Sequence, residues 1–295
     1  MGTVEKSQRV IVAAVDDSAA SDWAVRWAAD EAVRHGARLT LAHVVSPITF
    51  STPDRRISDR VMRWQTRRGH RALAHALEIA TDQIGSTPDV PIECEIGYGA
   101  IIPTLSTLVP DAWMIAVGSP PRMSWGGRRL GSVSAGLCRH APCSVAVVHG
   151  DIPKESLERP VVVGIDGSQA STYAIGVAFE EASRRRVPLI AVHVWSDVGV
   201  FPALGMKWET RRDAGEKALG EFLAPWLEHH PDVVVTRRLF CDLPAHWLLM
   251  EARRAGLVVV GSRGRGGFES LTLGSVATAV ATASDAPVIV ARPPR

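Results

Sequence analysis

A glycine- and arginine-rich segment at residues 261–275 carries the residue types that bind phosphate. It follows the apolar run 257–260, which predicts a buried strand, and it precedes the run 276–281, which predicts a helix. Glycine permits positive φ, so several backbone N–H groups can point at one anion. A helix that begins near residue 274 adds unpaired N–H groups and the positive end of its dipole. The segment therefore predicts a phosphate site; the alternative interpretation is a surface turn that binds nothing.

Two common phosphate motifs do not describe this segment. A Walker A loop requires a Gly-Lys pair, and the chain contains none. A dinucleotide fingerprint that starts at Gly264 needs a glycine where the chain has Glu269. The spacing that is present is Gly261-x-x-Gly264, nine further residues (265 to 273), and then Gly274-Ser275.

The chain contains one structural unit twice. Asp16-x-Ser18 follows an apolar run in the first half, and Asp166-x-Ser168 follows one in the second, 150 positions later (16 to 166). A Val-Gly-Ser triplet recurs after 143 positions (117 to 260), as does a Gly-Ser-Val triplet (131 to 274). A period as long as a domain indicates a tandem duplication.

Each copy alternates strands and helices, which predicts a mainly parallel open sheet with helices on both faces. In the first copy we expect strands at 9–15, 38–45, 91–96, 113–117 and 144–148, and helices at about 18–35, 58–85, 100–109 and 132–140, with a loop at 47–57. The predicted domains are residues 1–149 and 161–295, joined by a charged linker at 150–160.

Composition argues against several other partners. Of the 295 residues 46% are hydrophobic and 22% charged, and the formal net charge is +2, so we expect neither a nucleic-acid nor a membrane partner. The chain shows no signal-peptide core and no apolar run of about 20 residues, so we expect a cytoplasmic protein. The cysteines and histidines lack zinc spacing, which predicts buried thiols and no metal site. We interpret the arginine clusters at 55–68 and 184–186 as solvated helix faces.

The Asp-x-Ser at the end of each opening strand, the glycine spacing and the closing Ala-Pro-Val-Ile-Val-Ala at 286–291 resemble the ATP-binding subgroup of the universal stress protein family. The resemblance covers nearly the whole chain. It implies a five-stranded Rossmann-like sheet in each copy, a pseudo-twofold pairing of the copies, and an adenine-nucleotide site. It does not by itself imply chemistry.

In an open α/β sheet the ligand lies at the carboxyl ends of the strands, where the strand order reverses. Asp166 is placed there to bind a ribose hydroxyl or a metal ion, and alternatively to cap the next helix. With the resemblance, the second site comprises Gly164, Asp166, Gly261, Ser262, Arg263, Gly264, Arg265, Gly266, Gly267, Gly274, Ser275 and Val276. The first site comprises Ala14, Asp16, Gly118, Arg128, Gly131, Ser132 and Val133. We expect alanine at Gly261 to block a phosphate without affecting the fold, and alanine at Gly264 to be excluded by its φ.

The first copy departs from the pattern at two positions. Pro121 stands where the second copy has a glycine, and proline has no N–H to donate. Asp17 stands where the second copy has Gly167, and a further carboxylate disfavours a triphosphate. We therefore expect unequal sites, with the second filled first.

The leading hypothesis is an ATP-binding sensor or regulator in stress response, with ATP bound alone or with Mg²⁺ and slow or no turnover. No residue is assigned a catalytic role, because no motif supplies a base beside the loop. Two alternatives stay open: a ligand-free dimerising module that acts by docking, and a nucleotide hydrolase on the same fold. The apolar runs 144–148 and 288–291 predict pairing of the two copies within the chain and, in addition, a homodimer. The sequence identifies no protein partner.

Overall fold

The structure is a computed structural model that describes residues 9–47, 55–85, 90–120, 130–195, 208–264 and 273–293. The first copy contains β1 (Val10–Ala14), α1 (Ala19–His35), β2 (Arg38–Val45), α2 (Arg55–Ile84), β3 (Ile92–Tyr98), α3 (Ile101–Leu108), β4 (Ala112–Gly118), α4 (Ser132–His140) and β5 (Ser144–Val148). A short 3-10 helix, η1 (Lys154–Glu158), lies in the segment expected as a linker. The second copy contains β6 (Val161–Ile165), α5 (Gln169–Arg185), β7 (Leu189–Trp195), α6 (Trp208–His229), β8 (Val235–Cys241), α7 (Pro244–Ala252), β9 (Leu257–Gly261), α8 (Ser275–Ala283) and β10 (Val288–Ala291).

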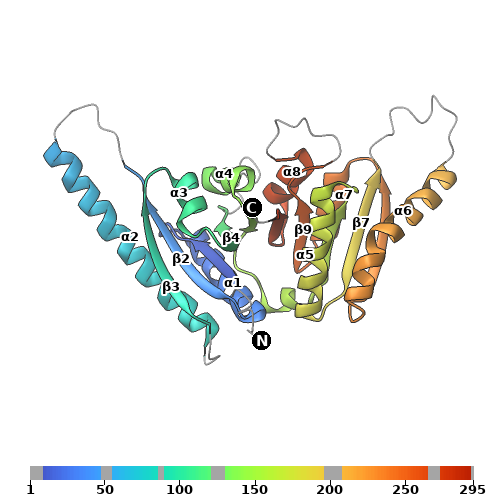
Figure 1. The fold of residues 1–295 in the computed structure, drawn as a ribbon, viewed down its shortest axis with the longest axis horizontal. Helices are drawn as coiled ribbons and strands as arrows, with labels where there is room; N and C mark the ends of the chain where they lie inside the picture. The colour runs from blue at the N-terminus through green and yellow to red at the C-terminus, as the bar shows by residue number, and fades with distance from the viewer. Residues whose placement is uncertain are drawn as a thin grey trace, which may run out of the picture.

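The ten strands form one sheet in the order β3-β2-β1-β4-β5-β10-β9-β6-β7-β8. Each copy contributes five strands, and all pairs are parallel except β5 with β10, which join the two halves in antiparallel register. Figure 1 shows the copies as two wings that meet in the middle of the molecule. The predicted fold class and the predicted pairing of the two copies within the chain are both confirmed.

Helices cover both faces of this sheet. Buried residues of α1, α2, α5 and α6 form one apolar layer, and buried residues of α3, α4, α7 and α8 form the other. The central strands lie between the layers, which explains their near-continuous β-branched sequence. Ile11 and Val12, neighbours that point to opposite faces, are both fully buried. None of the described helices is long and apolar enough to cross a membrane.

The two long helices α1 and α5 end in the same way with different residues. The chain leaves α1 through Gly36 at φ 58° and leaves α5 through Arg186 at φ 55°, and each backbone N–H bonds back to the last turn. These left-handed caps are the usual place for glycine, because a Cβ crowds the backbone there. Arg186 is equivalent to Gly36, 150 positions earlier (36 to 186), and its backbone is therefore strained where that of Gly36 is not.

Helix α2 and the cysteines agree only in part with the sequence-based expectations. Helix α2 begins at Arg55, inside the expected loop, and its arginine side chains from Arg56 to Arg68 are exposed as expected. Cys138 and Cys143 are buried, and burial raises the pKa of each thiol to about 12. Cys94 is exposed and Cys241 is partly exposed, because they lie in the edge strands β3 and β8, so the prediction of buried thiols is wrong for these two.

The cluster 184–186 is only partly a solvated face. Arg184 and Arg186 are exposed, but the Arg185 side chain is 2% exposed and forms ion pairs with two carboxylates. The expectation is wrong for Arg185, because its helix packs against the first copy at that turn.

Two glycines allow strands β4 and β9 to approach the helices beside them. A Cβ on Gly118 would lie 2.0 Å from the carbonyl oxygen of Ala20 in α1. A Cβ on Gly261 would lie 2.8 Å from the carbonyl carbon of Ala170 in α5. Both contacts are with backbone atoms, which cannot rotate away, so both positions require glycine for packing.

We expect Arg186→Gly to stabilise the protein by about 0.5–1 kcal/mol, because it removes left-handed strain at an exposed position and the added freedom of the unfolded chain offsets part of the gain. Gly36→Ala should destabilise it by about 1 kcal/mol, although a Cβ there meets nothing within 4 Å. Urea unfolding measures both changes. Equal midpoints for wild type and Arg186→Gly would contradict the assignment of strain.

We expect Gly118→Ala and Gly261→Ala each to destabilise the protein by about 1–3 kcal/mol, since the new methyl group forces a strand and a helix apart. Gly164→Ala is the matched control: its Cβ would meet Leu248 side-chain methyls at 3.1 and 3.3 Å, and the first copy already has Ala14 at that position. The control should change stability by less than about 1 kcal/mol. Thermal unfolding without ligand measures all three, and unchanged melting of Gly118→Ala would contradict the close contact.

Candidate functional site

The strand order reverses once in each copy. In the first copy the chain runs from β1 through β2 to β3 at the edge of the sheet, and then returns to the other side of β1 with β4 and β5. Strands β1 and β4 therefore flank the reversal. In the second copy β6 and β9 flank it. Crevices at the carboxyl ends of such strands are the ligand sites of open α/β sheets. The predicted acidic residues follow β1 and β6, and the predicted glycine segments follow β4 and β9.

In the second copy the residues that follow β6 and β9 are in contact. The Asp166 carboxylate accepts the Ser168 backbone N–H at 2.9 Å, and the Ser168 hydroxyl donates to the Arg263 carbonyl at 3.3 Å. The second Asp166 oxygen, Oδ2, lies 2.6 Å from where a Cβ on Gly264 would stand. The Asp166 side chain therefore supports the turn before α5, whose N-cap is Ser168, and also borders the glycine segment. Its role toward a ribose hydroxyl or a metal ion stays a prediction.

The glycine segment is closed at its base and leads directly into a helix. The backbone N–H of Gly274 donates to the Ser262 carbonyl at 2.9 Å, which holds the two ends of the segment together. Helix α8 then begins at Ser275, and within the described residues no side chain caps it. Its first N–H groups and its dipole are directed to the same end of the sheet as Asp166. A helix start of this kind is suited to an anion.

The first copy repeats this arrangement with an added charge. Asp16 accepts from the Ser18 backbone at 3.2 Å and from its hydroxyl at 2.6 Å. Asp17 adopts φ 67° where Gly167 adopts φ 77°, so the turn is the same and the aspartate tolerates it. The Asp17 carboxylate is paired with Arg68 of α2 at 3.4 Å, which offsets part of the added negative charge.

Most of the predicted residues lie where the sequence placed them. Gly164 and Ala14 lie in β6 and β1, Gly118 and Gly261 end β4 and β9, Gly131 and Gly274 precede α4 and α8, and Ser132, Val133, Ser275 and Val276 begin these two helices. Four predicted residues, Arg128, Arg265, Gly266 and Gly267, lie outside the described residues, as does Pro121. Whether the set binds a nucleotide stays a prediction.

The two expectations for alanine at Gly261 and Gly264 are both wrong. Gly261 contacts the backbone of α5, so alanine there disturbs packing as well as any ligand. Gly264 does not have a positive φ, and its constraint is the neighbouring Asp166 carboxylate. A test of binding therefore needs a different substitution.

Two side chains of the site were not singled out from the sequence. The Ser171 hydroxyl accepts the Asp166 backbone N–H at 3.1 Å, and Arg68 pairs with Asp17. The position of Ser171, three residues after the capping Ser168, was a usable local signal. The pairing of Arg68 was not, because it joins residues 51 positions apart. His193 is buried, and its Nδ1 lies 2.7 Å from the Ile165 carbonyl.

Comparison with known proteins agrees with the duplicated architecture. A model of the universal stress protein family matches residues 8–149 and again residues 158–292. A universal stress protein of Mycolicibacterium smegmatis is 44% identical over 284 residues, which cover 96% of this chain and 97% of the relative. A universal stress protein of Mycobacterium tuberculosis is 42% identical over 284 residues and 96% of each chain.

Solved structures show the same fold. A universal stress protein of Archaeoglobus fulgidus matches with a TM-score of 0.73 at 19% identity and covers 97% of this chain and 99% of its own. A structure from Pseudomonas aeruginosa matches with a TM-score of 0.61 at 13% identity and covers 97% and 94%. The two matches of the family model and the near-complete coverage of the relatives lead to one conclusion: the chain belongs to the universal stress protein family and carries two of its domains in tandem.

Proposed function

We propose that the second copy binds ATP at the carboxyl ends of β6 and β9, and that the protein acts as a nucleotide-dependent sensor or regulator in stress response. One observation carries the proposal: a carboxylate, a glycine segment closed by a backbone hydrogen bond, and a helix start that no described side chain caps converge at one reversal of strand order. Each part is suited to a different portion of a nucleotide.

The donor set fits a triphosphate with a ribose. The N–H groups at the start of α8 and along 261–264 would hold phosphate oxygens, and Arg263 would add positive charge. The Asp166 oxygen that borders Gly264 would accept from a ribose hydroxyl or bind a Mg²⁺ carried by the phosphates. A magnesium ion would balance phosphate charge at this carboxylate, which is otherwise unfavourable beside an anion.

Asp166→Asn is the cleanest test of this site. Asparagine keeps an oxygen for the Ser168 N–H, so the turn into α5 is preserved, while the charge is removed. Loss of a charged hydrogen bond costs about 1.5–3 kcal/mol, so we expect ATP affinity to fall about 10- to 100-fold. Calorimetric titration measures the affinity, and the melting temperature without ligand should be unchanged.

The matched control is Asp16→Asn in the first copy, which should leave the tighter binding phase intact. ATP at 100 times its Kd stabilises a protein by about 2.7 kcal/mol, so the wild type should melt at a higher temperature with ATP. If Asp166→Asn keeps full affinity, ATP does not bind here. If the wild type neither melts later with ATP nor retains nucleotide on purification, a docking module becomes the better description.

We expect the two sites to fill in order, the second before the first. The first site has Asp17 in place of Gly167 and Pro121 in place of a glycine. Asp17→Gly should tighten the weaker phase, because it removes a like charge at a turn that glycine also adopts at φ 77°. Two equal, independent sites in the wild type would contradict this order.

The homodimer expected from the sequence stays a prediction, and its original basis has changed. The apolar strands β5 and β10 pair with each other inside one chain, so they offer no free edge. Light scattering of the purified protein decides the oligomeric state.

A further inference from the structure

A group of charged side chains is buried where the two copies meet, away from the predicted nucleotide sites. Helices α1 and α5 converge on the same face of the sheet (Figure 1), and their last turns place Glu31, His35, Glu181 and Arg185 together. All four side chains are at most 2% exposed. Four ionisable groups removed from water are costly unless they neutralise one another.

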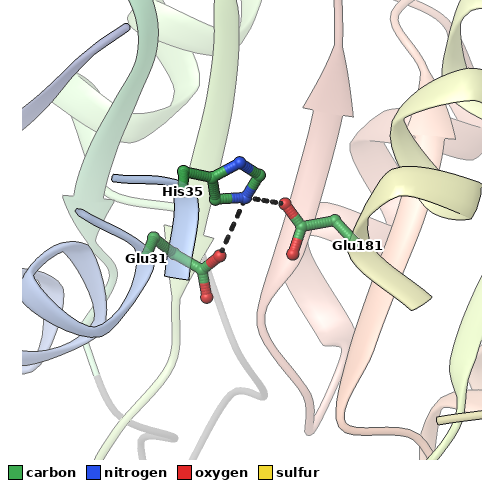
Figure 2. A group of neighbouring side chains, drawn as sticks. All are labelled: Glu31, His35 and Glu181. Atoms are coloured by element: carbon green, nitrogen blue, oxygen red, sulfur yellow. Dashed lines mark hydrogen bonds and ion pairs between the residues drawn. The ribbon is translucent and has the colours of Figure 1, made fainter. Parts of the chain in front are cut away.

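The contacts cross between the copies. The Arg185 guanidinium bonds Glu31 of the first copy and donates to Glu181 of its own copy at 3.0 Å. His35 of the first copy lies with its Nε2 2.9 Å from Glu181 Oε1 and 3.6 Å from Glu31 Oε2 (Figure 2). Glu31 Oε2 has no hydrogen bond to any other described residue. Each carboxylate therefore gives one oxygen to Arg185 and turns the other toward His35.

The charges of these four groups balance only when His35 is protonated. Within the four buried groups, two carboxylates face one guanidinium, so neutral His35 leaves one negative charge that the partly exposed Arg34 offsets from outside the group, and imidazolium removes it from inside. Burial alone would raise the pKa of Glu31, but Arg185, His35 and Arg34 lower it well below its ordinary range. Burial alone would lower the pKa of His35, but the hydrogen bond to Glu181 and the negative charge of Glu31 at 3.6 Å raise it. Both shifts favour the fully charged form.

Other charged groups face His35 from its second nitrogen. The Arg9 guanidinium lies 3.3 Å from His35 Nδ1, and Glu180 lies 3.9 Å from it. Arg9 can donate to Nδ1 only when His35 is neutral, whereas Glu180 attracts the imidazolium. Arg9 and Glu180 also bond each other.

Arg34 and Arg184 complete the charged surroundings. Arg34 donates to Glu31, and Arg184 donates to Glu180 and to the Arg34 carbonyl. Arg9, Arg34, Arg184 and Glu180 are all partly exposed, so solvent screens them more than the buried four. The buried carboxylates therefore dominate the protonation of His35.

Comparison of the two copies shows which member of the group can change its charge. Glu31 and Glu181 are equivalent, 150 positions apart, and so are His35 and Arg185 (35 to 185). Arginine holds its charge at every physiological pH, whereas histidine titrates near pH 6.5. We call the four buried groups Glu31, His35, Glu181 and Arg185 the charged seam. Its cation from the second copy, Arg185, is therefore permanently charged, whereas its cation from the first copy, His35, depends on a proton.

A divalent cation is a less suitable occupant of this position. His35 Nε2 and one oxygen of each glutamate lie within 4.8 Å of one another, which is the donor set of a metal site. However, Arg185 is buried against both carboxylates and already compensates half of their charge. A cation of charge +2 would leave excess positive charge in a dry environment, whereas one proton brings the buried charges to balance.

We propose that His35 is a proton-dependent clasp between the two copies, which holds α1 to α5 while its imidazole is charged and releases part of that attachment when the proton leaves.

The direction of the pH dependence follows from the raised pKa of His35. A group whose pKa is higher in the folded state stabilises the fold fully below its unfolded value, about 6.5 for histidine. That stabilisation is lost as the pH rises through the folded pKa. The clasp is therefore closed in mildly acidic solution and weakens on the alkaline side. Each unit by which folding raises the pKa changes the unfolding equilibrium constant about tenfold across this window.

The test compares the full chain with His35→Gln and His35→Arg from pH 5.5 to 9.5. Glutamine retains a donor for Glu181 without a titrating charge, and arginine reproduces the permanent charge of Arg185. Urea unfolding gives the equilibrium constant at each pH, and hydrogen exchange of the last turns of α1 and α5 reports on the seam itself. The difference between wild type and each variant isolates His35, because all other groups titrate in common.

We expect the advantage of wild type over His35→Gln to be largest at pH 5.5 and to fall at least tenfold, in equilibrium constant, by pH 9.5. Protection factors at the two helix ends, which are corrected for the base-catalysed intrinsic exchange rate, should fall over the same range in the wild type and stay level in His35→Gln. Parallel pH profiles of wild type and His35→Gln overturn the proposal, whether or not His35→Arg folds. A rise in melting temperature with Zn²⁺ that EDTA reverses and His35→Gln abolishes also overturns it, in favour of a metal site.

Discussion

The antiparallel pairing of β5 with β10 is the interaction on which the rest of the structure depends. It aligns Val145, Ala146 and Val147 with Val290, Ile289 and Val288, all nearly or fully buried. It removes from solvent the two apolar edges that two separate sheets would expose. The edges that remain are β3 and β8, which carry charges such as Glu93, Glu95, Arg237 and Arg238 that disfavour strand addition.

This pairing also creates the charged seam. Once the sheets are continuous, α1 and α5 lie on the same face and their last turns meet. Glu31 and Glu181 then lose contact with water and require Arg185 and His35 as partners. Each of the two carboxylates has one partner in each copy, His35 in the first and Arg185 in the second. The charged seam therefore exists only in the duplicated chain.

The sequence predicted the parts of the fold that depend on neighbours in the chain. Strands β2 and β5 have the expected bounds, 38–45 and 144–148. The central strand β5 is buried on both faces and therefore has an almost unbroken apolar sequence, whereas Thr40 and His43 interrupt the apolar residues of β2. The starts of α1 and α5 follow from Ser18 and Ser168, each of which accepts a backbone N–H three residues later. Because the sequence repeats, the strands and helices assigned in the first copy could also be expected at the equivalent positions of the second.

The features that sequence reasoning missed depend on residues far apart in the chain. Arg185 meets Glu31 across 154 positions, and no local pattern distinguishes it from the exposed Arg184 beside it. Gly261 was assigned to a ligand, yet its nearest atoms belong to Ala170 on another element. One signal was available: Glu31 and Glu181 stand on the otherwise apolar faces of α1 and α5, at equivalent positions of the two copies.

Helices α1 and α5 connect the predicted nucleotide sites, at their first turns, to the charged seam, at their last turns. Each has 17 residues, so it extends about 25 Å. The first turn of each is held against β4 or β9 at a glycine that leaves no room for a methyl group, and the last turn lies in the charged seam. A movement of α5 at the seam therefore reaches the contact between Asp166 and Gly264 unless the helix bends. If the proposed nucleotide shifted α5, linkage would make the connection reciprocal: the nucleotide would change the proton affinity of His35, and a proton on His35 would change the affinity for that nucleotide by the same factor.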